Sequence, residues 1–125
     1  MLLHTAGHTI GALTWKQSPN ARVAAVINGM QTEHFDFMGK SVSLGSFFEG
    51  YGFTMIGVLL LLTVLLGLQS AAPDRKMLLP LSLFQLFMGS IELIYFFPFA
   101  AVISLLAGTF TLYAYFKSPL WKPSN

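Results

Sequence analysis

The sequence predicts an all-α integral membrane protein, a four-helix transmembrane bundle with an additional amphipathic helix at the membrane interface. Hydrophobic residues make up 54% of the 125 residues, and charged residues only 10%. Because a soluble domain carries about a quarter charged residues, this chain has too few charges to cover a water-facing surface. Long apolar stretches in the second half of the chain, each able to cross a bilayer, point to the same class.

Polar turns and prolines delimit the predicted spans. The uncharged run 51–68 is followed by a turn that contains Pro73, and the next apolar run is interrupted only by Glu92. Pro98 suits the first turn of a further helix, where its missing N–H is tolerated. The first apolar segment is only about 22 Å long as a helix, so we expect a short or tilted span. No basic region precedes that segment, which disfavours a signal peptide. In a single transmembrane domain, residues 1–125, helices are predicted at about 1–15, 46–69, 77–97 and 98–116.

The most polar part of the chain lies between the first and second spans. Within it Val23, Ile27 and Met30 follow helical spacing, with Phe37 near the same face. We therefore predict an amphipathic helix over about residues 20–37, lying at the membrane interface with these side chains buried.

Basic residues indicate the orientation. If the first segment spans, both chain ends and the turn at 71–76 share one side. That side holds four basic residues: Arg75, Lys76, Lys117 and Lys122. The other side holds three: Lys16, Arg22 and Lys40. The positive-inside rule therefore favours both termini in the cytoplasm. The expected location is a bacterial inner membrane.

Several function classes find no support in the sequence. The absence of cysteine excludes disulfides, thiolate metal sites and thiol nucleophiles. The basic residues are scattered, so nucleic acid is not an expected partner. No nucleophile elbow, phosphate-binding loop or zinc-peptidase motif is present. The sequence therefore assigns no catalytic residue, metal site or cofactor.

Glu92 is the residue most indicative of function, because an ionisable side chain inside a span costs about 2.5–3.5 kcal/mol on insertion scales. Gln85 and Gly89 share its helical face, and we expect that face to point into the bundle. The alternative is that Glu92 lies about a turn from the interface, where water satisfies it. Three residues are the expected partners of Glu92: His8, Glu49 and Gln85.

Glu49 precedes the first strong span and is expected at a depth similar to that of Glu92, where paired carboxylates can hold a proton or a cation. The alternative is a charge at headgroup level with no partner. His8 could donate to either carboxylate, or could be a neutral histidine hydrogen-bonded within the bundle. His4 lies four residues from His8, a spacing that can ligate a metal, but no acidic residue accompanies the pair.

Small residues predict where helices approach closely. Gly7 and Gly11 form a G-x-x-x-G pair, and Ala100, Ser104 and Gly108 repeat at four-residue spacing. These faces could close the bundle or form a homo-oligomer, and the sequence leaves both open.

Three stretches, about a third of the chain, resemble small uncharacterised bacterial four-helix membrane proteins, broadly of the DoxX-like type. They are AGHTIGAL, SFFEGYGFTMIGVLLLL and IELIYFFPFAAVISLLAG. The resemblance implies a four-helix bundle and supplies no reaction. The first helix is shorter here than in such proteins. The pattern positions are His8, Glu49, Gly50 and Gly52.

Two other membrane families share some features. Small multidrug transporters are similar in length and helix count, but their membrane-embedded Glu lies in the first helix, whereas Glu92 is in the last but one. The membrane glutathione-transferase and eicosanoid group is similar through Arg22, Asn28 and Glu33, although the spacing differs.

We expect a membrane protein that binds a lipophilic small molecule or a membrane partner subunit, with membrane lipid around it. The alternatives are a proton-coupled small-molecule transporter that uses Glu92, and a lipid-modifying or redox membrane enzyme. The candidate residues for ligand binding or proton coupling are His8, Glu49, Gln85 and Glu92.

Overall fold

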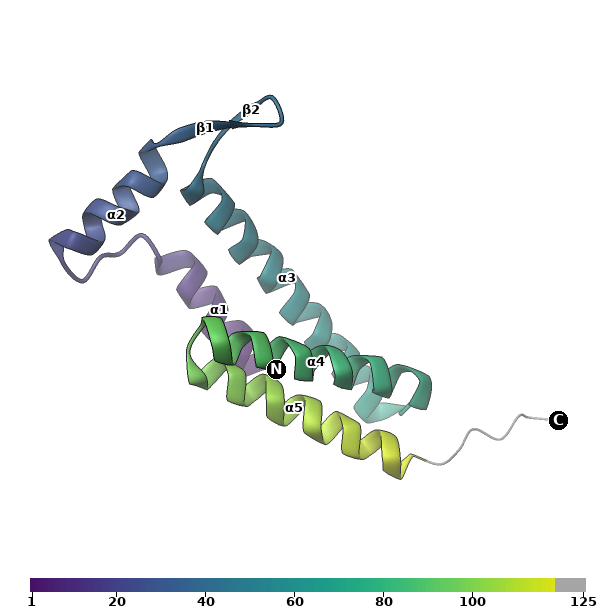
Figure 1. Cartoon of the computed structure of the whole chain (residues 1–125). Helices are drawn as coiled ribbons and strands as arrows, with labels where there is room; N and C mark the ends of the chain where they lie inside the picture. Colours follow the sequence, from purple (N-terminus) through teal and green to yellow (C-terminus); the bar gives the residue numbers. More distant parts are fainter. Residues whose placement is uncertain (119–125) are drawn as a thin grey trace. The chain divides into compact units, whose positions relative to one another are not determined.

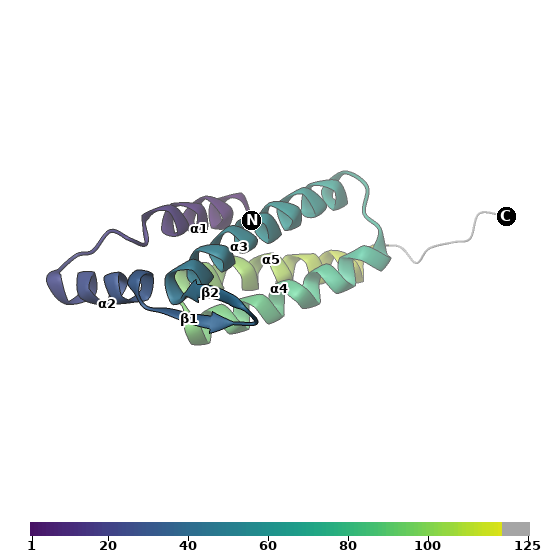
Figure 2. The same cartoon turned by 90° about the horizontal axis from the view of Figure 1, so that it is seen from above.

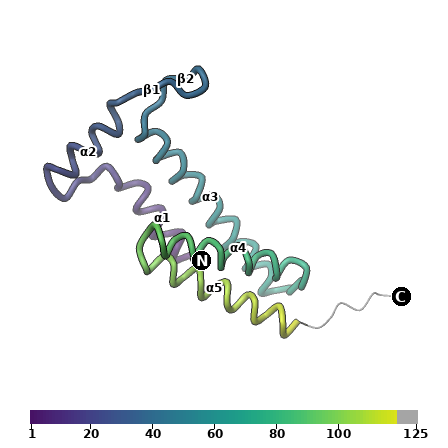
Figure 3. The backbone as a smooth tube through the Cα atoms, in the orientation of Figure 1, coloured from purple at the N-terminus to yellow at the C-terminus, as the bar shows by residue number. Residues whose placement is uncertain are grey.

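The computed structural model describes residues 1–118, which form five helices and one β-hairpin (Figure 1). The path of the chain between these elements can be followed in Figure 3. Contacts group the described residues into two compact units: Thr5–Val58, and Met1–His4 together with the chain from Leu59 onward. The elements are α1 (Leu2–Thr14), α2 (Ala21–Thr32), β1 (His34–Phe37), β2 (Lys40–Ser43), α3 (Leu44–Ala71), α4 (Arg75–Tyr95) and α5 (Pro98–Lys117).

Three of the helices, α3, α4 and α5, are long and apolar enough to cross a membrane. This confirms the membrane class and the three strong spans predicted from the sequence. The first helix, α1, has 13 residues, about 20 Å, and is not among the candidate spans of residues 1–118.

The ends of α1, α3, α4 and α5 differ from the predicted bounds by two residues at most, and capping residues explain the starts of α3 and α4. At the start of α3, the Ser43 N–H donates to Ser46 Oγ (3.1 Å) and the Ser46 N–H donates to Ser43 Oγ (3.2 Å). This reciprocal cap starts the helix at Leu44 rather than 46. Asp74 caps α4 by accepting from the Lys76 N–H (2.9 Å), so α4 begins at Arg75 rather than 77.

The predicted amphipathic helix is shorter than expected, and the chain is not purely helical. Helix α2 begins after Asn20, whose side chain accepts from the Val23 N–H at 3.0 Å, and ends at Thr32. Phe37, predicted on the buried side of this helix, instead lies in strand β1, which pairs antiparallel with β2. No residue of α2 is buried, and Val23 is exposed. The alternating apolar and polar residues of His34–Phe37 suit a strand, and this local pattern overrides the helical spacing that precedes it.

Helices α4 and α5 lie side by side in both views (Figures 1 and 2). A side-chain carbon added at Gly89 would lie 2.8 Å from Leu105 Cγ, and one at Gly108 would lie 2.9 Å from Leu86 Cγ. Each glycine therefore accommodates a leucine of the opposite helix. The small-residue face predicted on α5 is confirmed, since Ser104 and Gly108 are buried.

The unit Thr5–Val58 is built differently. Phe35 and Phe37 of the hairpin contact the ring of Phe47 on α3, with ring centroids 6.1 and 5.3 Å away. Within the same unit, a side-chain carbon at Gly52 would lie 3.3 Å from Ala12 Cβ. Gly7 and Gly11 of α1 are exposed, and a carbon added at either would meet nothing within 4 Å, so this predicted face makes no close contact within the chain. Ala12 supplies the contact instead.

Candidate functional site

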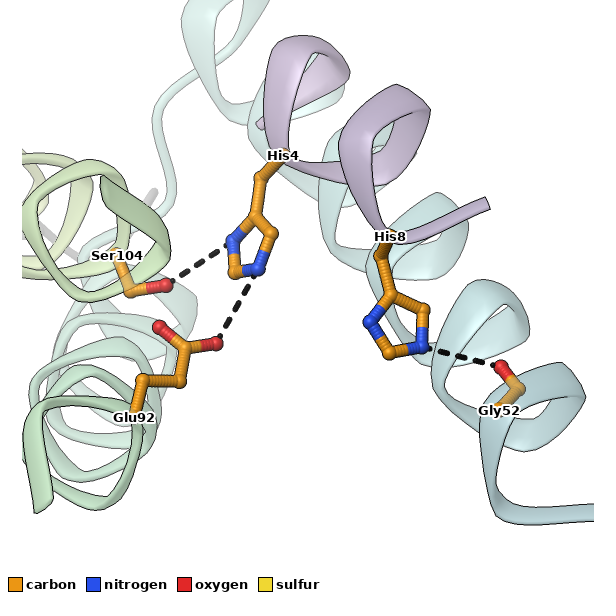
Figure 4. Close-up of polar contacts among 5 residues, drawn as sticks. All are labelled: His4, His8, Gly52, Glu92 and Ser104. Carbon is orange, nitrogen blue, oxygen red and sulfur yellow. Dashed lines mark hydrogen bonds and ion pairs between the residues drawn. The ribbon is translucent and has the colours of Figure 1, made fainter. Parts of the chain in front are cut away.

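The imidazole of His4 lies between a carboxylate and a hydroxyl (Figure 4). Its Nε2 is 3.3 Å from Glu92 Oε1, and its Nδ1 is 3.2 Å from Ser104 Oγ. His4 and Glu92 are each 6% exposed, and Ser104 is fully buried. Three helices thus contribute one polar side chain each to a buried cluster, which we call the His4 cluster (His4, Glu92 and Ser104).

Local sequence explains why these side chains meet. Glu92 lies on the buried face of α4, at three- and four-residue spacing from Gly89, Gln85 and Ser82. Ser104 belongs to the small-residue face of α5, where a short side chain leaves room for an imidazole. Glu92 is in the last turn of α4, three residues before its end at Tyr95. The cluster therefore lies closer to the α4–α5 turn than to the opposite ends of these helices.

The His4 cluster can hold one more proton without losing a hydrogen bond. A neutral imidazole with its proton on Nε2 donates to Glu92 and accepts from the Ser104 hydroxyl. A doubly protonated imidazole donates to both, because the hydroxyl can rotate to present a lone pair. The geometry therefore suits both protonation states of His4.

Gln85 continues the polar face of α4 away from the cluster. Its side chain is fully buried, and Nε2 donates to the Leu81 carbonyl at 3.1 Å. Among the described residues its Oε1 has no hydrogen-bond partner. A buried acceptor without a donor costs about 1–3 kcal/mol. Ser82, nearly one turn further, donates to the Gly108 carbonyl at 3.0 Å. A polar face thus extends from Glu92 along the α4–α5 contact.

Two of the predicted site residues lie in the other unit with contacts of their own. His8 Nε2 is 3.2 Å from the Gly52 carbonyl oxygen (Figure 4). Glu49 Oε1 is 2.5 Å from Lys16 Nζ, and both side chains are partly exposed. Glu49 is therefore paired with a cation rather than with a second carboxylate, and the alternative of a charge with no partner does not hold either. The structure assigns Glu92 a partner that the sequence analysis did not propose, His4.

The sequence carries only a partial signal for His4 and Ser104 as site residues. His4 and His8 share a helical face, and their spacing does not indicate which of them meets Glu92. Ser104 was interpreted only as a packing residue, since serine is also a small residue in membrane helices. The four-residue spacing of both patterns was the available signal.

The residue types in the cluster invite comparison with catalytic and metal centres. Serine hydrolases also place a histidine between a serine and an acid. Here Ser104 lies inside a continuous helix, whose backbone N–H groups are used in helical hydrogen bonds and cannot form an oxyanion hole. Among residues 1–118, no three His, Asp or Glu side chains come together as metal ligands. The arrangement is best suited to holding a proton.

Fold and site together define a small helical membrane protein with a buried His–Glu pair. No protein-family model matches the chain, and no curated protein or solved structure is similar to it. The functional argument therefore rests on the residues of this chain.

Proposed function

We propose that this protein couples proton binding at the His4 cluster to the binding and transport of a lipophilic small molecule across the membrane. One observation carries the proposal: both ring nitrogens of His4 are engaged by buried polar side chains, one of them the carboxylate of Glu92. An ionisable residue inside a membrane span is by default a functional candidate, because its insertion is costly.

The net charge of His4 and Glu92 determines whether a substrate cation and a proton bind together or in exchange. With one shared proton, His4 and Glu92 are together neutral, whether the proton lies on the imidazole or on the carboxyl group. Gain or loss of a proton leaves a net charge in a medium of low dielectric constant, which is unfavourable. A monovalent cation that approaches Glu92 therefore favours release of the proton, and a returning proton favours release of the cation. The substrate class is a lipophilic monovalent cation.

The membrane arrangement forms part of the same proposal. In it α1 joins α3, α4 and α5 in a four-helix bundle of the DoxX-like type in a bacterial inner membrane, with both termini cytoplasmic. Support comes from the far end of the α4–α5 pair, where Arg75 Cζ lies 4.5 Å from the centroid of Tyr115. Basic and aromatic side chains together at one helix end are typical of a membrane interface. A transporter of this size is expected to act as a homo-oligomer.

Proteoliposomes with an acidic, pyranine-loaded interior test the proposal. Ethidium added outside should speed the rise of internal pH in liposomes that carry the wild-type protein, because each cation entering releases a proton. Glu92→Gln should abolish this acceleration. Glu49→Gln is the matched control, since it removes a partly exposed carboxylate outside the cluster.

Two results would overturn proton-coupled transport. One is a Glu92→Gln protein that accelerates the pH change as fast as wild type. The other is a rate of pH change in wild-type proteoliposomes that equals the rate in protein-free liposomes. If, in that second case, ethidium still binds the purified protein in a Glu92-dependent manner, the protein binds lipophilic cations without transporting them.

A further inference from the structure

The length of α3 places its first turns at a defined depth. Its 28 residues span about 42 Å, close to the roughly 40–45 Å of a bilayer with its headgroups. The uncharged residues 51–68 fit the hydrocarbon core, which is about 30 Å thick. Residues 44–49, which include Glu49, are therefore expected in the headgroup layer.

The β-hairpin packs against these first turns. Cross-strand pairing sets Phe35 opposite Val42 and Phe37 opposite Lys40, so all four side chains share one face. That face is turned toward α3, because both phenylalanine rings contact Phe47. The hairpin thus holds the cationic side chain of Lys40 beside the first turns of α3, at the depth expected for lipid headgroups.

An open groove lies between the hairpin and α3. Its volume is about 350 Å³, and its lining includes Lys40, Val42, Ser46, Gly50, Tyr51 and Thr54. Along α3 the groove starts at headgroup level, at Ser46, and reaches the start of the uncharged run. Gly50 leaves it open, since a side-chain carbon there would meet nothing within 4 Å.

We propose that this groove binds one anionic phospholipid, with the phosphate against Lys40 and the glycerol and first acyl carbons along Gly50 and Thr54. The groove is charged at the end that holds Lys40 and less polar beside Gly50, in the same order as the phosphate and the glycerol ester region of a lipid. Lys40 suits a phosphate, and the surface beside Gly50 and Tyr51 suits the glycerol ester region. Ser46 Oγ donates to the Ser43 carbonyl (2.7 Å) and accepts from the Ser43 N–H, so Lys40 supplies the charge.

The tip of the hairpin supports a location in lipid headgroups. Met38 has φ of 55° and is 92% exposed, followed by Gly39 at φ 81°. A turn with two positive φ angles favours Asn-Gly, so the backbone of Met38 is strained there. Its side chain is almost fully exposed. An exposed thioether beside Lys40 suits the boundary between headgroups and acyl chains.

Native mass spectrometry of the detergent-solubilised protein tests the site. Phosphatidylglycerol and phosphatidylcholine with identical acyl chains are added at equal concentration, and inorganic phosphate is added in a separate arm. We expect phosphatidylglycerol to be retained preferentially. Lys40→Gln should weaken its binding about fivefold, as expected for one lysine near a membrane surface. Gly50→Leu should block the groove and reduce binding at least as much.

Matched controls separate the groove from general effects. Arg22→Gln removes a basic residue of the same unit outside the groove. Gly57→Leu adds the same side chain to an exposed glycine of α3 that also has open space around it. Both should bind phosphatidylglycerol like wild type, and circular dichroism checks that all variants keep their helicity.

Three outcomes would overturn the proposal: equal retention of the two lipids, inorganic phosphate binding as tightly as the lipid, or Lys40→Gln and Gly50→Leu matching their controls. The proposal does not depend on proton coupling, because no groove residue belongs to the His4 cluster.

Discussion

Substitution of Gly89 by alanine tests the close approach of α4 to α5 at this glycine. The new methyl group would lie 2.8 Å from Leu105 Cγ and 3.0 Å from the Leu105 backbone nitrogen. The leucine side chain could rotate, but the backbone nitrogen can move away only if α5 shifts. Overpacking of this kind costs about 1–3 kcal/mol.

The same substitution also raises helix propensity, by about 0.5–1 kcal/mol. Gly57→Ala isolates that gain, because a side-chain carbon at Gly57 meets nothing within 4 Å. The difference in unfolding free energy between the two variants should therefore be about 1–3 kcal/mol, with Gly89→Ala the less stable.

Circular dichroism during titration of mixed micelles with sodium dodecyl sulfate measures this difference. Equal midpoints for Gly89→Ala and Gly57→Ala would refute the reasoning, since they would mean that α4 and α5 do not approach as closely as the glycine contacts indicate.

Three further predictions concern polar and turn residues. Ser82→Ala removes the hydrogen bond to the Gly108 carbonyl. It should lower the unfolding free energy in micelles by about 0.6 kcal/mol, the average for such bonds in membrane helices. An unchanged midpoint of the dodecyl sulfate titration would contradict this prediction. Met38→Asn should slow amide exchange in the hairpin, because asparagine tolerates positive φ, whereas Met38→Val should speed it; the reverse order would argue against the left-handed turn. Glu49→Gln should leave the micelle unfolding midpoint unchanged, since exposed ion pairs contribute little. A large loss would show that this pair is structural.

The sequence predicted the three long helices to within two residues because their apolar runs are long, broken only by Glu92, and are separated by segments that contain Pro73 and Pro98. It did not predict the hairpin. Val23, Ile27 and Met30 share one helical face, and Phe37 extends that spacing. The alternating strand pattern of His34–Phe37 covers only four residues, which is too short to stand out against the helical spacing before it.

The site was predicted in part. The buried position of Glu92 and Gln85 follows from the cost of polar groups in lipid, which any membrane helix must satisfy. The partner of Glu92 could not be derived in the same way. Which histidine meets a carboxylate depends on how far one helix is displaced along another, and one turn separates His4 from His8. Helix periodicity assigns both histidines to the same face and carries no information on that displacement.

The very short connection between α4 and α5 has a consequence for biogenesis. Only Phe96 and Phe97 separate the end of α4 from Pro98. With so short a link, α4 cannot settle in the bilayer and leave α5 behind in water, so the two are expected to leave the translocon as one helical hairpin. Entering together, they would give Ser82 its acceptor and bring Ser104 close to Glu92 during insertion itself. An α4 segment expressed alone should then insert less efficiently than the α4–α5 pair, a difference that glycosylation mapping would measure.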